Sequence, residues 1–262
     1  MSPPRLRLER CTSLGDGLWK VDEQQAHHLL KVLRVSPGEN LEGLLAGERC
    51  RVRLESAEGG LAARVLSSLP GKGSTPRIVL LASLLKGGDF EHLLRGATET
   101  GVSVILPVEA ARSVPRITEA EKAKKVARWS RILEEATLQC GAPKIPLIAE
   151  PAPLEKILET ELPALRLAGI LEDATIPIAT VPPAAEVAIA IGPEGDWDER
   201  EKEVLRQAGF KAVSLGPLVL KAFVAAIVAC SYLVLAWEGK CRGNTQGEEI
   251  QDQGPRMPDK PV

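Results

Sequence analysis

The sequence has few cysteines, and none are paired at the spacing of metal or redox motifs. Its five cysteines are scattered singly through 262 residues without a C-x-x-C pair. Neither a zinc site nor a disulfide framework is therefore expected. Residues 1–10 alternate charges with leucine and lack the uninterrupted apolar core of a secretory signal peptide. These absences predict a cytoplasmic protein without a metal centre.

The chain also lacks a membrane-length apolar run and a strong excess of one charge. Its most apolar stretch, Ala222 to Trp237, is 16 residues long, fewer than the ~20 that cross a bilayer. We expect a buried or interface helix there and no membrane association. Residues 1–149 hold 22 basic against 17 acidic residues, and residues 150–262 hold 11 against 18. The basic first half permits contact with phosphates, although a solvated surface explains it equally well.

The first part of the chain is predicted to form a small β-barrel followed by a linker. Between Arg5 and Leu69, short apolar segments alternate with glycine-containing turns, the pattern of short barrel strands. One short helix is expected from Ala26 to Arg34, and residues 70–76 contain no core-forming side chain. We therefore predict a domain of residues 1–70, a second of residues 76–240, and a disordered polar tail of residues 241–262.

Strands alternate with helices in the second domain. Apolar runs predict strands at residues 77–85, 102–108, 167–171, 187–191 and 211–215. Apolar positions three and four apart predict a helix capped by Asp89, and a longer helix from Thr118 to Gln139. A third helix begins at Asp198, which forms the sequence pattern of a capping box with Glu201. This alternation predicts an α/β fold with a parallel sheet covered on both faces.

The most informative stretch runs from Ile189 to Gly195, where an apolar strand stops at a Gly-Pro-Glu-Gly turn. Ligands bind at the carboxyl ends of strands in α/β sheets, so this turn is a candidate site. A second turn, at Leu215 and Gly216, follows the strand at 211–215. Glycine lets the backbone approach a ligand closely. For Glu194, direct ligand contact and acceptance of backbone hydrogen bonds at a helix end remain equally open.

Five ordered motifs resemble the RsmE family of bacterial ribosomal RNA methyltransferases, which belongs to the SPOUT superfamily. They are H-H-L with V-L-R at residues 27–34, G-A-T-E-T-G-V at 96–102 after Lys86, R-W-x-x-I-x-x-E-A-x-x-Q-C-G at 128–141, I-G-P-E-G at 191–195 and S-L-G-P at 214–217. Any one of them could occur by chance, but five in order over more than 200 residues are specific.

The resemblance implies a fold and an activity. The fold would be an N-terminal PUA-like β-barrel that binds RNA and a SPOUT methyltransferase domain whose parallel sheet contains a trefoil knot. The activity would be methylation of uracil N3 in 16S rRNA of the small ribosomal subunit, with S-adenosylmethionine as cofactor and a homodimer formed through the knotted domain. Periodicity alone would predict an ordinary doubly wound sheet, because chains are unknotted by default.

The resemblance also names candidate site residues. The cofactor-binding candidates are Leu171, Glu172, Ile191, Gly192, Pro193, Glu194, Gly195, Leu215, Gly216 and Leu220. The RNA-binding candidates Arg5, His28 and Arg34 belong to the N-terminal part of the match, where basic groups would meet phosphates or bases. Trp129 could stack on a base, but it lies in register with the apolar positions of its helix, so we expect it in the core.

The chain departs from the family pattern at several polar positions. Ala142 stands where the pattern has arginine, and Leu218 and Phe223 stand where it has arginine and glutamate. Lys221 keeps a positive charge and is the candidate catalytic residue. Its ammonium group cannot reproduce the two parallel hydrogen bonds of a guanidinium group.

Two further departures fall within the matched motifs, since Gly96 replaces a lysine and Asp196 replaces a glycine. Two other functions therefore remain open. One is a non-catalytic RNA- or ribosome-binding protein that keeps the fold. The other is a methyltransferase of the same fold with a different RNA target.

Overall fold

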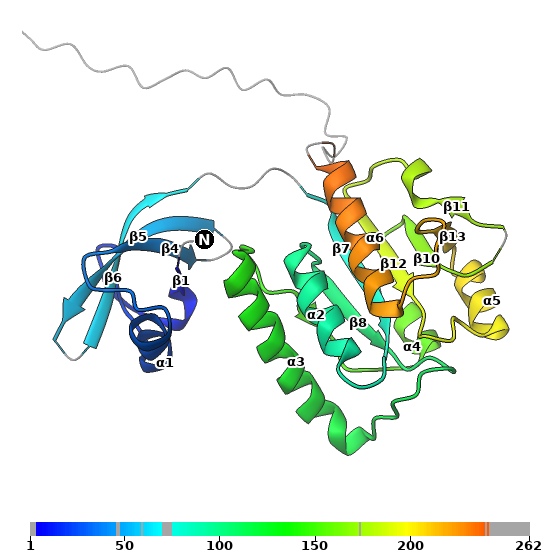
Figure 1. Ribbon diagram of the computed structural model, residues 1–262, viewed down its shortest axis with the longest axis horizontal. Helices are drawn as coiled ribbons and strands as arrows, with labels where there is room; N and C mark the ends of the chain where they lie inside the picture. Colours follow the sequence, from blue (N-terminus) through cyan, green and yellow to red (C-terminus); the bar gives the residue numbers. More distant parts are fainter. Residues whose placement is uncertain are drawn as a thin grey trace, which may run out of the picture.

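The computed structural model describes residues 4–45, 48–58, 60–69, 75–172, 174–238 and 240. The predicted tail at 241–262 and residues 70–74 of the predicted linker lie outside these residues. The described residues form two β-sheets, one before and one after the linker segment (Figure 1). We refer to them as the N-terminal sheet and the C-terminal sheet.

The N-terminal sheet has six strands in the order β1-β4-β5-β6-β3-β2. They are β1 (Arg5–Arg7), β2 (Thr12–Gly15), β3 (Leu18–Lys20), β4 (Asn40–Leu45), β5 (Glu48–Ala57) and β6 (Gly60–Ser68). Strands β1 and β4 pair in parallel, and the other neighbours are antiparallel. Apolar side chains from this sheet, including Leu6, Leu41 and Val52, form a buried cluster of their own. The pattern of short apolar segments is thus confirmed as strands.

The helix predicted at residues 26–34 begins earlier and ends earlier in the structure. Helix α1 (Glu23–His27) is capped by the Asp22 side chain, and the π-helical turn η2 (His28–Val32) follows it. The backbone of Arg34 has a φ of 55°, in the left-handed region. A residue in that region ends a helix, because it turns the chain away from right-handed geometry.

The C-terminal sheet has seven strands, and every pairing in it is parallel. Its order is β11-β13-β10-β12-β7-β8-β9. The strands are β7 (Arg77–Ser83), β8 (Val104–Val108), β9 (Leu147–Ile148), β10 (Arg166–Gly169), β11 (Ile176–Pro177), β12 (Glu186–Ile191) and β13 (Lys211–Ser214). The predicted parallel sheet is confirmed. Strands β9 and β11 went unpredicted because two residues cannot show a period.

Helices flank the C-terminal sheet. They are α2 (Asp89–Glu99), α3 (Glu119–Cys140), α4 (Leu154–Leu158), α5 (Glu199–Gln207) and α6 (Ala222–Trp237). The predicted capping box of Asp198 and Glu201 is present at the start of α5. The expectation that Asp89 caps α2 is wrong, because Gly88 holds the capping position and no side chain caps it.

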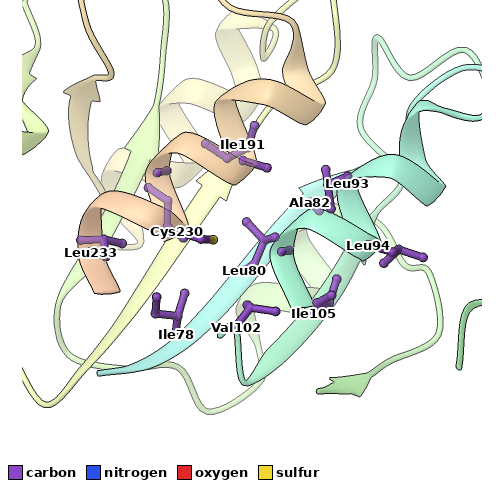
Figure 2. Close-up of a cluster of buried hydrophobic side chains, with 14 of the residues drawn as sticks. Ile78, Leu80, Ala82, Leu93, Leu94, Val102, Ile105, Ile191, Cys230 and Leu233 are labelled. Carbon is purple, nitrogen blue, oxygen red and sulfur yellow. The ribbon is translucent and has the colours of Figure 1, made fainter. Parts of the chain in front are cut away.

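Both faces of the C-terminal sheet are covered, as predicted. Along β7, Ile78 and Leu80 point to a cluster formed with α2, α3 and α6, whereas Val79 and Leu81 point to one formed with α4 and α5. Figure 2 shows the first cluster, in which side chains of β7, β8, α2 and α6 meet. Trp129 belongs to it, and its ring centroid lies 4.8 Å from that of Phe90. The expectation that Trp129 is a core residue is confirmed.

Helix α6 packs closely against α2 at Gly96. A Cβ atom at this position would lie only 2.6 Å from Cγ1 of Ile227 on α6. The glycine therefore lets the two helices approach, and a lysine here would require the Ile227 side chain to shift. No helix among the described residues is both long and apolar enough to span a membrane.

Arg5 connects the N-terminal sheet to α3. Its Nε donates to Glu42 of β4 at 2.8 Å, and its Nη1 donates to the carbonyl of Leu138 at 3.2 Å and to that of Gln139. Gly141 ends α3 with a left-handed backbone, and a Cβ there would lie within 2.6 Å of the Arg5 guanidinium. Arg5 thus satisfies carbonyl groups that the end of a helix leaves unpaired.

Glu42 is the buried acidic partner in this contact. Burial alone would raise the pKa of Glu42, but hydrogen bonds from Arg5 and Arg49 outweigh it and hold that pKa below its usual value. The carboxylate therefore stays ionised at neutral pH. Since the folded-state pKa of Glu42 is lowered, this ion-pair cluster contributes its full stabilisation above the unfolded-state pKa. It loses that contribution as the pH falls through the folded-state pKa.

The substitution Arg5→Met tests this structural role. It leaves Glu42 with one arginine and the end of α3 without a donor, so we expect a loss of about 2–3 kcal/mol in the free energy of unfolding at pH 7. Urea titration measures it, and the loss should shrink in acid as Glu42 becomes protonated. Arg10→Met is the control, because Arg10 and Glu134 form an exposed pair worth below about 1 kcal/mol. Equal stability of the Arg5 variant and the wild type would contradict the structural role.

Candidate cofactor site

A cavity of about 470 Å³ opens at the carboxyl ends of β10, β12 and β13, which are neighbours or near neighbours in the sheet. Its walls are formed by residues 169–172 at the end of β10, by residues 191–194 with Asp196 at the end of β12, and by residues 213–220 at the end of β13. This is where open α/β sheets bind ligands, and the volume falls within the usual range of small-molecule sites.

The structure brings nine of the ten cofactor-binding candidates together around this cavity. They are Leu171, Glu172, Ile191, Gly192, Pro193, Glu194, Leu215, Gly216 and Leu220. Gly195 is outside the lining. Sequence reasoning missed Thr175, Asp196 and Ala225, which also line the cavity. Asp196 directly follows the predicted turn, and Ala225 ends the family pattern that includes Leu218 and Phe223, so both could have been included. Thr175 lies in a segment without a motif.

The cavity wall combines apolar side chains with carboxylates. Glu172, Glu194 and Asp196 line it, and no lysine or arginine does so among the described residues. Arg206 pairs with Glu172 at 2.9 Å, and Lys202 pairs with Asp196 at 3.2 Å, both outside the lining. The cavity therefore presents acidic groups to a ligand and suits a cationic one. No cluster of metal-ligating side chains occurs in the described part of the chain.

Asp196 holds two walls of the cavity in place. Its backbone has a φ of 61°, in the left-handed region, where the family pattern has glycine. Aspartate can replace glycine here because it tolerates this region better than most residues do. Its carboxylate accepts the amide of Leu171 at 3.3 Å and pairs with Lys202, which is almost fully buried. Burial would lower the pKa of Lys202, but Glu199 and Asp196 outweigh it and raise that pKa. The loops after β10 and β12 are thereby tied to α5.

Gly192 packs against Trp197 and also lines the cavity. A Cβ atom at this position would lie 3.1 Å from the backbone nitrogen of Trp197 and 3.2 Å from its ring. Trp197 is fully buried, so it cannot move aside easily. Packing against Trp197 is thus one reason for glycine at this position, and close approach of a ligand stays a prediction. Gly216 differs, since its φ of 132° requires glycine and the space beside it is open.

Two contacts position the turn after β12. The carboxylate of Glu194 accepts a hydrogen bond from the amide of Lys86 at 3.3 Å, and Glu194 also lines the cavity. The Glu194 carboxylate satisfies a backbone amide and also faces the cavity. Both interpretations of Glu194, ligand contact and acceptance of a backbone hydrogen bond, therefore stay open. Arg112, on the loop after β8, donates to the carbonyl of Gly195 at 2.7 Å.

Three of the positions that depart from the family pattern, Leu218, Lys221 and Phe223, follow β13 on one side of the cavity. Leu218 lines it and is 77% exposed, and Phe223 packs near His92 with ring centroids 5.9 Å apart. Lys221 is exposed and holds the position just before α6, next to Leu220 of the lining. Ala142 is distant in the chain from this cavity and follows Gly141, on which Arg5 packs.

The RNA-binding candidates do not share one environment. His28 and Arg34 are exposed in and just after η2, together with His27 and Lys31. Both adjacent histidines are exposed. The side chain of Arg5 is only 11% exposed and bonded to Glu42 and α3. Binding of RNA by these three residues stays a prediction.

Comparison with known proteins identifies relatives of this chain. Residues 73–234 match the family model described as RNA methyltransferase domain. The chain is 31% identical over 219 residues to ribosomal RNA small subunit methyltransferase E of Synechocystis sp., covering 80% of this chain and 70% of that protein.

Solved structures agree with this result. A crystal structure of ribosomal RNA small subunit methyltransferase E from Neisseria gonorrhoeae, bound to S-adenosyl methionine, superposes with a TM-score of 0.77 at 26% identity. It covers 90% of this chain and 98% of that one. A structure from Legionella pneumophila with the bound cofactor SAM gives a TM-score of 0.78 at 27% identity, with the same coverage.

The link between Asp196 and Lys202 predicts a measurable coupling. Asp196→Asn keeps the size and tolerates the backbone conformation but leaves a buried ammonium with less compensation. We expect a loss of about 1–3 kcal/mol in the free energy of unfolding, measured by urea titration. In a Lys202→Met background the same change should cost less. Additive effects of the two substitutions would rule out the proposed link.

Proposed function

Because this chain belongs to the RNA methyltransferase family that includes ribosomal RNA small subunit methyltransferase E, we propose that it methylates uracil N3 in 16S rRNA of the small ribosomal subunit. The observation that supports this most is the cavity at the ends of β10, β12 and β13, which gathers nine residues named from family motifs. The relatives' names support a ribosomal RNA substrate. The base and the atom come from the family resemblance.

The cavity fits S-adenosylmethionine as the cofactor. Its apolar residues, such as Ile170, Ile191 and Leu215, suit the flat face of adenine, and its carboxylates suit an ammonium and a sulfonium group. When bound, the cofactor supplies a methyl group on a cationic sulfur. The residues of this chain would bind it, orient it and exclude water, and correct positioning of the reactants supplies much of the rate.

We propose that Lys221 stabilises the negative charge that develops on the base. Uracil N3 must lose its proton to solvent water, and the negative charge then spreads to the neighbouring carbonyl oxygens. An ammonium group near them stabilises that charge. Lys221 is exposed beside the cavity wall at Leu220, with the start of α6 behind it. Within residues 215–222, which close this side of the cavity, it is the only basic residue.

The N-terminal sheet is proposed to be the PUA-like barrel that binds RNA. Its exposed segment with His28, Lys31 and Arg34 supplies basic groups that would meet phosphates. The C-terminal part is proposed to contain the SPOUT trefoil knot, formed where residues 213–220 and α6 follow β13. The order β13-β10-β12 supports this proposal, because the three loops that would take part also share one cavity.

We propose that the protein works as a homodimer through the domain of the C-terminal sheet. Helix α6 is apolar on nearly all sides, yet only one side faces the core. On the other side Val228 is 36% and Leu235 is 74% exposed, and Leu218 and Val219 are exposed on the loop before the helix. Exposed apolar patches of this kind mark protein interfaces, and a second copy would cover them.

A non-catalytic RNA-binding protein is the second candidate function. The apolar and exposed Leu218 on the cavity wall favours it, since the family pattern has arginine there. Such a protein would keep the cofactor cavity and the basic surfaces without turnover. Both functions include binding of the cofactor and of RNA, but only the methyltransferase transfers the methyl group.

Calorimetry followed by a transfer assay separates these functions. We expect the wild-type protein to bind S-adenosylmethionine and to transfer its methyl group to small subunits isolated without this modification, with the product at uracil N3. Mass spectrometry of the digested RNA identifies the modified base. Cofactor binding without transfer would favour the non-catalytic function, and transfer to another base would assign a different target.

The variant Lys221→Met tests the assigned catalytic group. Loss of one positioned charge should lower kcat about 100- to 1,000-fold while leaving calorimetric affinity for S-adenosylmethionine unchanged. Lys221→Arg should retain part of the activity. Lys211→Met is the control, because Lys211 is an exposed lysine on β13 outside the cavity lining. A kcat within twofold of the wild type for Lys221→Met would remove Lys221 from the mechanism.

A further inference from the structure

A second cavity lies between the loop after β7, the start of α2, residues 115–117 and the first half of α3. Its volume is about 230 Å³. Leu84, Leu85, Phe90 and Trp129 contribute its apolar side, and all four are buried. The volume is below the usual range for whole small-molecule ligands, so the cavity suits one flat group rather than an entire cofactor.

The polar side of this cavity has one unpaired cation. Glu91 pairs with Arg128 at 2.7 Å, and the carboxylate of Glu121 accepts the hydroxyl of Thr118 at 2.7 Å. The guanidinium of Arg116 donates to the carbonyls of Ala110 and Ala111. Lys125 is exposed and forms no ion pair or hydrogen bond within the described part of the chain.

The charges around the cavity favour an anionic chain next to the bound group. Residues 122–131 of α3 contain five basic residues and no acidic one. Lys124, Lys125, Arg128 and Arg131 are exposed among them, whereas Lys122 is buried beside Glu119. A phosphate backbone passing along this surface would meet several cations.

The second cavity adjoins the cofactor cavity. Leu85 and Gly87 line the second one, and Lys86 between them donates its backbone amide to Glu194, which lines the first. An RNA whose target base meets the cofactor held in the first cavity can therefore place a neighbouring base in the second. The walls of the two cavities thus meet at Lys86 and Glu194.

We propose that the second cavity binds one base of the RNA next to the base that is methylated. The proposal rests on the proposed function, because it takes RNA as the substrate. The apolar side receives the face of the base, and Lys125 contacts the adjoining phosphate. Single-stranded RNA is commonly recognised in this way, with an unstacked base on an apolar or aromatic surface and cations along the backbone.

Two neighbouring lysines give a matched experiment. Lys125→Gln should raise the KM for small-subunit RNA about 10-fold with little change in kcat, because it removes a charged contact to bound RNA. Lys124→Gln removes the same charge one residue away but does not line the cavity, and its KM should stay within about twofold. Calorimetric affinity for S-adenosylmethionine should be unchanged in both variants. Equal effects of the two substitutions would overturn the proposal.

An RNA fragment with single abasic nucleotides tests for the base itself. Removing one base close to the target should weaken binding to the wild-type protein about 5- to 150-fold, the range for losing one stacked base. Removing the others should have little effect. Uniformly small effects at every flanking position would overturn the proposal.

Equilibrium binding keeps this test separate from the proposed function. If the wild-type protein binds the fragment without methylating it, the proposed activity fails, and the abasic series and the two lysine variants still decide on the second cavity. If a free mononucleotide competes at the second cavity as well as the fragment does, the cavity is a nucleotide site and not an RNA subsite.

Discussion

The parallel pairing of β12 between β7 and β10 is the constraint on which the site depends. Strand β12 pairs with β7 along its whole length and with β10 up to the pair Gly169 and Ile191, and all but its first residue are buried. Parallel strands end at the same edge of a sheet, so the chain emerges from all three at one place. There Glu194 meets the amide of Lys86, and Asp196 meets that of Leu171.

These contacts explain how an acidic cavity is held open. Arg206 and Lys202 pair with carboxylates of the wall without lining the cavity, which limits the cost of placing acids close together. Buried Trp197 against Gly192 and Arg112 against Gly195 fix the turn after β12. A wall that is already fixed loses little entropy when a ligand binds, which increases affinity.

Local signals in the sequence predicted the elements that have them. The capping box at Asp198 and the apolar run of α6 gave correct positions because neighbouring residues determine them. The roles of Arg5 and Gly192 could not be predicted in this way. Arg5 bonds to Glu42 and to α3, 37 and more than 130 positions away, and Gly192 is limited by the ring of Trp197. Contacts between distant segments depend on the fold. The sequence therefore showed that Arg5 and Gly192 belong to motifs, but it could not show which residues they contact.

A crystal structure of the protein with S-adenosylmethionine tests the central claim most directly, namely that the cavity at the ends of β10, β12 and β13 is the cofactor site. We expect density for the cofactor between residues 169–172, 191–196 and 213–220, with its cationic groups nearest Glu194 or Asp196. Density for the cofactor elsewhere on the protein, or an empty cavity at saturating cofactor, would contradict it.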